Sequence, residues 1–348
     1  MFTRIPETVQ TLYAELLDQL RQLESPLGTM PQGGSFVSKS IRGARYWYQQ
    51  TMEGERKRQK YLGRETPELI EAMDQAKERR HAESDDIKRR RELVAMLRTG
   101  GMAHEPAPIA AVVRILARAG VFHLGGVLVG TQAFSCHANM LGIRFEMQSL
   151  RTADVDVAQD ASIALAVSEE PPVQILEELR REEPRFVAVP GFSQREPSTS
   201  FKVRGRDLRV DFLTPMIANR TRPVFLRHLG VAAQPLAGLD YLIETTVDAA
   251  VLANSGVLVL VPQPGRFALH KLWLASQRPA SDQAKARKDL RQAEQLLDAL
   301  AMDRPADIDE AFAALASRAR MANSVRKALG KIAGDVRDRV VATVPSLK

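Results

Sequence analysis

The sequence predicts an α+β protein with a small mixed-sheet core and helices packed on one side of the sheet. Short apolar runs alternate with helical patterns between residues 108 and 190. Two further runs, 200–204 and 208–213, flank a Gly-Arg-Asp turn and predict a β-hairpin. At 348 residues the chain is too long for one small domain. We therefore expect three regions: 1–100, 101–223 as the core, and a mostly helical 224–348.

The N-terminal region predicts a helix, a basic β-hairpin unit and a long charged helix. Apolar residues recur at helical spacing over 6–23. Gly43 and Gly54 mark turns between expected strands at 35–41, 44–50 and 56–63. Thr66 and Pro67 suit the N-cap and first turn of a helix that runs to Leu97.

The same patterns place the elements of the other two regions. In the core we expect helices over 108–119, 131–141 and 172–181, and strands over 121–130, 152–158 and 185–190. After residue 224 we expect one brief strand at 257–261, and helices over 267–274, 282–300 and 308–329.

Bulk composition favours a cytoplasmic globular protein with an anionic partner. Hydrophobic residues make up 45% and charged residues 26%, and no apolar run approaches the roughly 20 residues that span a membrane. The first residues lack a signal-peptide core, and the single cysteine, Cys136, excludes an internal disulfide and suits a buried thiol. A formal net charge of +7 favours a nucleotide or a nucleic acid without choosing between them. The sequence does not give the oligomeric state.

Three short motifs carry the expected chemistry. An apolar strand, Val127–Val129, ends in Gly130 and Thr131; a second expected strand carries Asp154 and Asp156; and a third carries Asp211 between apolar neighbours. Alternate residues of a strand share a face, so Asp154 and Asp156 point the same way. A third carboxylate from a neighbouring strand would complete a cluster that repels itself unless a cation binds there. Hard divalent ions such as Mg²⁺ prefer this all-oxygen setting and share it with substrate phosphates.

In order and context, these motifs resemble the DNA polymerase β-like nucleotidyltransferase superfamily. Thr131 stands where serine is commoner, and the interval from Thr131 to Asp154 is longer than usual, which implies an enlarged first helix or loop. The abortive-infection toxin nucleotidyltransferases are a closer resemblance. In those toxins a lysine faces the triphosphate and a later Lys-Asp pair supports it, and Lys271 with Lys288-Asp289-Leu290 is similar to that pattern.

The resemblance implies a nucleotidyltransferase that uses two Mg²⁺ ions and an NTP substrate. Gly130, Thr131 and Lys271 would contact the phosphates. Asp154 and Asp156 would hold the metal that bridges the triphosphate, and Asp211 would join them at a second metal and polarise the acceptor hydroxyl.

The acceptor and some rival functions stay open at this stage. RNA such as tRNA, a protein side chain and a small hydroxyl compound all fit as acceptors. One rival is an inactive transferase fold that binds nucleic acid; another is a different enzyme whose acids are structural. No Walker-type or dinucleotide-binding glycine motif is present, which disfavours P-loop and Rossmann folds.

The N-terminal hairpin is the part of the sequence best suited to RNA. Basic and aromatic residues interleave along it, as in Lys39, Arg45, Tyr46, Trp47 and Tyr48. Such a surface can follow a phosphate backbone and stack bases. The alternative is a small sheet whose aromatic residues pack on its own helix while the cations are solvated.

Replacing Arg56, Lys57, Arg58 and Lys60 together with Gln tests this hypothesis. Each lost phosphate contact lowers the salt dependence of binding, so we expect weaker RNA binding and a flatter plot of log K against log salt. Fluorescence anisotropy with labelled RNA across a salt series measures both, and NTP affinity serves as the control. Unchanged RNA affinity and slope would assign the hairpin a structural or protein-binding role.

Overall fold

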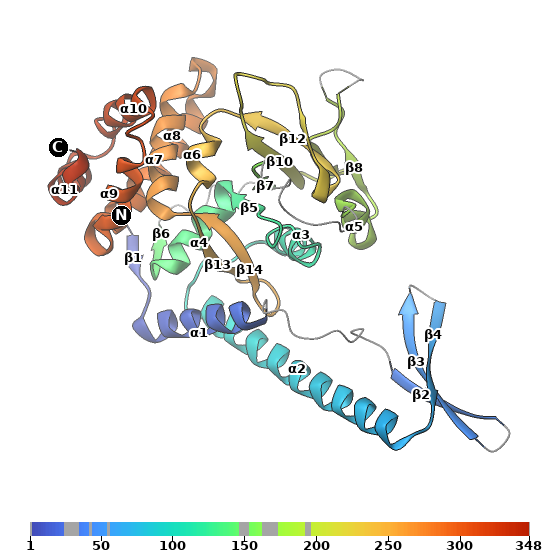
Figure 1. Ribbon diagram of the computed structural model, residues 1–348. Coiled ribbons are helices and arrows are strands. Elements are labelled where there is room, and N and C mark those ends of the chain that lie inside the picture. Colours follow the sequence, from blue (N-terminus) through green and yellow to red (C-terminus); the bar gives the residue numbers. More distant parts are fainter. Residues whose placement is uncertain are drawn as a thin grey trace. The chain divides into compact units, whose positions relative to one another are not determined.

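The structure is a computed structural model, and it describes residues 2–23, 35–41, 44–53, 56–145, 153–161, 173–191 and 196–347. The chain divides into two compact units: Met1–Arg21 with Leu93–Lys348, and Gln22–Glu92. These units group the chain differently from the three predicted regions, because residues from Ile109 to Val344 share one hydrophobic core. Figure 1 shows the elements of both units.

The smaller unit has the predicted three-stranded sheet. Strands β2 (Ser35–Ile41), β3 (Ala44–Glu53) and β4 (Arg56–Arg64) pair antiparallel in the order β2-β3-β4. Helix α2 (Pro67–Thr99) follows, and the hydroxyl of Thr66 accepts the N–H of Leu69 at 3.2 Å, which confirms the predicted N-cap. The side chains of Arg56, Lys57, Arg58 and Lys60 lie outside the described part, so RNA contact at the hairpin stays a prediction.

The larger unit contains a mixed sheet of seven described strands, which confirms the α+β class. Its order is β11-β12-β10-β7-β5, with β9 paired to the first half of β10 and β8 paired to β9. Strands β7 and β12 run parallel to β10, and the other pairs are antiparallel. The strands are β5 (Val127–Val129), β7 (Asp154–Ala158), β8 (Phe186–Ala188), β9 (Ser200–Val203), β10 (Arg209–Pro215), β11 (Val224–Leu226) and β12 (Val231–Leu236).

The predicted helices of the core are present, but its first strand is shorter than predicted. Helices α3 (Ala107–Arg118), α4 (Gly130–Met140) and α5 (Ile175–Glu182) follow the predicted order, and Cys136 on α4 is buried as expected. The strand predicted over 121–130 spans only Val127–Val129. Gly120 and Gly125 adopt positive φ values of +76° and +84°, so the apolar residues between them form turns.

The C-terminal region contains more strand than predicted. Strands β11, β12, β13 (Thr246–Val251) and β14 (Val257–Pro262) are present where the sequence predicted one strand at 257–261. The first two extend the central sheet, and β13 pairs with β14 in a separate hairpin. Strand β1 (Phe2–Arg4), which was also missed, pairs with β6 (Ile143–Phe145).

The C-terminal helices gather together in the larger unit, orange to red in Figure 1. The single helix predicted over 308–329 is wrong, because 3-10-type hydrogen bonds such as Arg318 N–H to the Leu315 carbonyl turn the chain between α9 and α10. Leu315 is fully buried in that turn. The helices are α6 (Leu239–Ile243), α7 (Pro264–Gln277), α8 (Gln283–Asp303), α9 (Pro305–Ala313), α10 (Ala319–Leu329) and α11 (Gly334–Thr343).

A second hydrophobic cluster holds the N-terminal helix α1 (Glu7–Leu23) within the larger unit. Leu16 and Leu20 of α1 pack in this cluster with Leu97 at the end of α2 and Leu252 beside β13. At its centre the buried Tyr13 hydroxyl accepts the N–H of Ala250 at 3.1 Å. No helix in the described part of the chain is both long and apolar enough to cross a membrane.

Tyr13→Phe tests how far this hydrogen bond stabilises the larger unit. The variant leaves the buried Ala250 N–H without its acceptor, which should cost about 1–3 kcal/mol of unfolding free energy. Thr11→Ala is the matched control, because it removes an exposed hydroxyl bond to the Glu7 carbonyl on the same helix and should change stability by less than about 0.5 kcal/mol. Urea denaturation measures both, and equal values for the two variants would contradict the assignment.

Candidate active site

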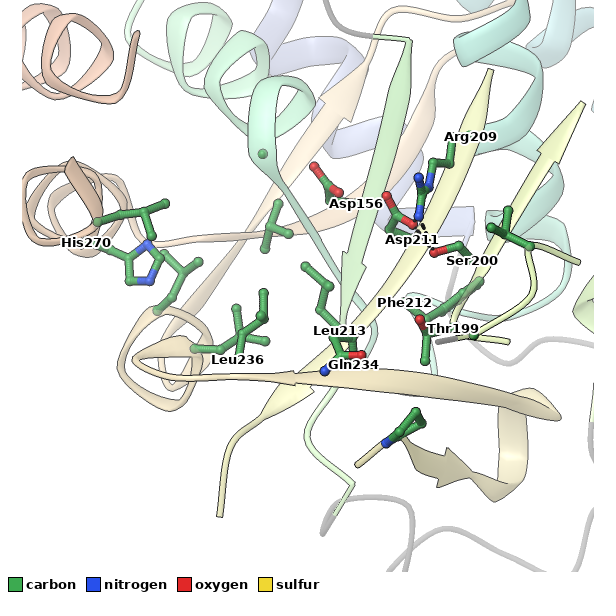
Figure 2. A pocket seen from close by; sticks show the side chains of 18 of the residues that line it. Asp156, Thr199, Ser200, Arg209, Asp211, Phe212, Leu213, Gln234, Leu236 and His270 are labelled. Carbon is green, nitrogen blue, oxygen red and sulfur yellow. Dashed lines mark hydrogen bonds and ion pairs between the residues drawn. The ribbon is translucent and has the colours of Figure 1, made fainter. Parts of the chain in front are cut away.

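The pairing of β7 with β10 places the predicted acids on one face of the sheet. In this parallel pair Asp156 lies beside Asp211 and Asp154 lies beside Arg209. Alternate residues point to opposite faces, and Val155 and Val210 are fully buried on the other face. Asp154, Asp156 and Asp211 therefore share the face that points away from these valines, and Figure 2 shows Asp156 and Asp211 on neighbouring strands.

The Gly-Thr turn lies directly against this acidic face. Val129 at the end of β5 pairs with Asp156, and Gly130 follows with φ +69°, a conformation that favours glycine. A Cβ on Gly130 would lie 2.4 Å from Asp156 Oδ2. Glycine is therefore needed at this position for its backbone angle and for the close approach of the turn to the acid.

Burial and the charge of Asp211 raise the pKa values of both Asp154 and Asp156. Burial, and then the charges of Asp211 and Asp154, raise the pKa of Asp156 to about 6. Burial and the charge of Asp211 also raise the pKa of Asp154, although Arg209 acts in the opposite direction. The site thus carries more negative charge than the surrounding protein groups neutralise, which is the setting that a cation would stabilise.

Two residues that the sequence analysis missed hold Asp211 in place. Arg209 Nε donates to Asp211 Oδ1 at 2.8 Å, and the Ser200 hydroxyl donates to the same oxygen. Arg209 Nη2 also donates to Ser200 Oγ at 2.9 Å, which closes a ring of hydrogen bonds (Figure 2). The hairpin itself was predicted, but a turn at 205–207 would place residue 200 opposite residue 212, whereas the observed register pairs Ser200 with Asp211.

A group of cations from the C-terminal helices completes the site. Lys271 Nζ donates to Asp289 Oδ1 at 2.8 Å, and Arg278 Nη2 donates to Asp289 Oδ2 at 3.1 Å. The Asp289 side chain is only 4% exposed, so it fixes both cations firmly. The neighbouring Lys288 donates to Thr131 Oγ1 at 3.1 Å. Burial and the charge of Lys271 lower the pKa of Lys288, against the pull of nearby acids.

These groups border a pocket of about 620 Å³, within the usual range for small-molecule sites. Gly130, Asp156, Asp211 and Lys271 all line it, whereas Thr131 is turned to Lys288. The rest of the lining includes an apolar wall of Leu236, Leu239, Leu242, Phe267 and Leu274. The pocket therefore offers both charged groups and apolar surface to one ligand.

His270 also lines the pocket but is not a cation there. Burial and the charge of the adjacent Lys271 lower the pKa of His270 to about 3. The ring is therefore neutral at physiological pH and packs beside Trp273, with centroids 5.5 Å apart. This agrees with the packed role that a lone histidine in an apolar helix usually has.

The acids do not form a ready-made cage for a metal ion. Among the described residues, no group of three His, Cys, Asp or Glu side chains is gathered closely enough to hold one. Asp154 acts on Asp156 through its charge, while Asp156 and Asp211 are direct neighbours. Because Mg²⁺ is commonly held by one or two carboxylates together with substrate phosphates, this pair still suits it.

Comparison with known families now assigns the class of protein. Residues 107–317, more than half of the chain, match a family model described as a nucleotidyltransferase. The chain belongs to this nucleotidyltransferase family. Residues 6–72 match a second model, described as a domain of unknown function (DUF6788). No curated protein and no solved structure matches the chain.

The raised pKa of Asp156 predicts a pH-dependent effect of Asp156→Asn. An ordinary Asp in the unfolded chain has a pKa near 3.9, so between about pH 4 and 6 the native protein binds more protons and loses stability as pH rises. Without divalent cations, Asp156→Asn should be about 1–3 kcal/mol more stable than wild type at pH 7.5, with the gain vanishing near pH 4. Urea denaturation at both pH values tests this, with the exposed Asp335→Asn as control. A gain that is the same at both pH values would contradict the prediction.

Proposed function

We propose that this protein transfers a nucleoside monophosphate from an NTP to a hydroxyl acceptor, with Mg²⁺ as the cofactor. The observation that carries the proposal is the register of β7 and β10, which sets Asp156 beside Asp211 next to the Gly130 turn. Family membership supports nucleotidyl transfer in general. The identities of the metal, the nucleotide and the acceptor are part of what we propose.

The donor set and its charge suit Mg²⁺. Asp154, Asp156 and Asp211 offer only carboxylate oxygens, and the raised pKa of Asp156 indicates an uncompensated negative charge. Asp156 and Asp211, which are already neighbours, would hold the ion or ions, and Asp154 would join them in the bound state. When bound, Mg²⁺ neutralises phosphate charge and polarises the reacting oxygens.

The chain's own groups would bind and orient the triphosphate. The absence of a side chain at Gly130 lets the backbone approach a phosphate closely. Lys271 and Arg278 line the pocket with charges held by the buried Asp289, so little side-chain freedom is lost when they meet an anion. Lys288 would support Thr131 at the same turn.

Asp211 would act on the acceptor hydroxyl from a fixed position. Arg209 and Ser200 hold one carboxylate oxygen of Asp211, which restricts the rotation of the side chain. In-line attack on the α-phosphate would release pyrophosphate and needs no covalent enzyme intermediate. The catalytic gain would come from positioning and electrostatic stabilisation.

A second candidate is a transferase fold that binds nucleic acid without catalysis. Two observations favour it. Asp211, the third acid, already forms an ion pair with Arg209, and the acids in the described part of the chain are not gathered into a metal cage. The order of motifs, which resembles active polymerase β-like enzymes and abortive-infection toxins, favours the active protein.

Transfer of label from α-³²P NTPs distinguishes the two candidates. The wild-type protein is incubated with each NTP, Mg²⁺ and a cell lysate, and RNA, protein and small molecules are then separated. We expect label in one fraction, with a loss on the order of 100-fold or more in Asp156→Asn and none in Asp335→Asn. Nucleotide binding without any transfer by the wild type would favour the inactive fold, and full activity of Asp156→Asn would show that the acids are not the site.

A further inference from the structure

The acidic face of the sheet continues into a row of cations along β9. In the antiparallel pairing of β9 with β10, Ser200 lies beside Asp211 and Lys202 lies beside Arg209. Phe201 and Val203 are buried on the opposite face. By alternation, Ser200 and Lys202 lie on the same face as the acids, and the exposed Arg204 follows in the turn after β9.

The two outer cations of this row have no acid of their own. Lys202 and Arg204 are exposed, and neither forms an ion pair with any carboxylate in the described part of the chain. Their neighbours differ: Arg185 and Arg206 both pair with Glu183. Lys202 and Arg204 therefore keep their full charge for a partner.

Arg209 joins this row to the acids. Its Nε and Nη2 bond to Asp211 and Ser200, and the side chain is 44% exposed. A guanidinium has five N–H donors, so three remain for another anion, and the two bonds already made fix the plane of the group. Side chains two residues apart on one strand are spaced by about 6.6 Å. Cations therefore continue outward from Asp211, from Arg209 on β10 to Lys202 on β9 and Arg204 in the turn after it.

We infer that this row, Arg209, Lys202 and Arg204, binds the phosphate backbone of a single-stranded nucleic-acid acceptor whose terminal hydroxyl reaches Asp211. The inference rests on the proposed function and names its acceptor class. A small neutral acceptor would gain nothing from charges that lie progressively farther from the acids, whereas a polyanion contacts each of them in turn.

The transfer itself would take place at Asp211, at the inner end of this row. The acceptor oxygen forms a bond to the α-phosphorus of the NTP, and the bond from that phosphorus to the bridging oxygen of the β-phosphate breaks. Pyrophosphate leaves with the electron pair, and the hydroxyl proton passes to Asp211 or to water. The nucleic acid is lengthened by one nucleotide.

The double variant Lys202→Gln/Arg204→Gln tests the surface. Anisotropy of a labelled single-stranded RNA is measured across a salt series with the full-length protein. Each lost contact should lower the slope of log K against log salt by about 0.7, so we expect a decrease of about 1.4 and, at moderate salt, an affinity loss on the order of tenfold. The matched control, Arg320→Gln/Lys327→Gln, removes the same two charges from exposed positions on α10 and should leave both quantities unchanged.

The outcomes separate this inference from the proposed function. Equal RNA affinity and slope in wild type and double variant, or no RNA binding by the wild type, would overturn the inference even if the protein transfers nucleotides. If the double variant lost binding to a polyglutamate peptide but bound RNA as well as the wild type does, the inference would be overturned in favour of a protein acceptor. Weaker RNA binding with unchanged affinity for the magnesium complex of an NTP supports it, even if the wild type transfers no label and the proposed function fails.

Discussion

The site depends on the register of two parallel strands, β7 and β10, which sets two carboxylates side by side. Like charges on adjacent strands are unfavourable, and burial of Asp156 adds to the cost. The opposite face explains why the register holds, because Val155, Val157, Val210 and Phe212 are all fully buried there. A slip of one residue would turn this apolar set toward solvent and the acids into the core. The hydrophobic core therefore enforces an electrostatic arrangement that would otherwise relax. A separate pairing, of β5 with β7, brings Gly130 against Asp156.

The cations that offset these acids come from helices far along the chain. The buried Asp289 on α8 orients Lys271 and Arg278, and the adjacent Lys288 reaches Thr131 at the start of α4. Helices α7 and α8 pack on each other and share the core that covers the sheet. The C-terminal helices are thus part of the site, and they belong to the same compact unit as the sheet. The negative charge of the buried Asp289 also offsets the repulsion between Lys271 and Arg278, so these two cations can lie close together in one pocket.

Much of the fold and the acids could be predicted from local patterns, whereas their partners could not. The alternation around Asp156 and Asp211 and the glycine turn at Gly130 are short-range signals. The hairpin between β9 and β10 could also be predicted, but counting back from a turn at 205–207 would pair residue 200 with residue 212, one position away from the observed pairing of Ser200 with Asp211. Strand β12 joins the sheet as a parallel neighbour of β10, a long-range choice that no local pattern in a short segment containing Pro235 reveals. The turns around Val121 were missed because an apolar run outweighed its flanking glycines. Among the described residues the three acids do not form a three-ligand cage, and this depends on side-chain distances, which order along the sequence does not contain.

Asp211 separates the two sides of the site. Toward β7 it faces Asp156 and the pocket that Lys271 lines, and toward β9 it meets Ser200 and Arg209 (Figure 2). The cations are divided in the same way: Lys271 on α7 and Arg278 just after it are held by the buried Asp289, whereas Lys202 on β9 and Arg204 in the turn after it face solvent. A tightly held triphosphate needs preorganised charges, while an acceptor that must leave after transfer is better served by exposed ones, which are weaker and screened by salt. In the proposed reaction, Asp211 would thus lie between a firmly bound NTP and an acceptor that exchanges after each transfer.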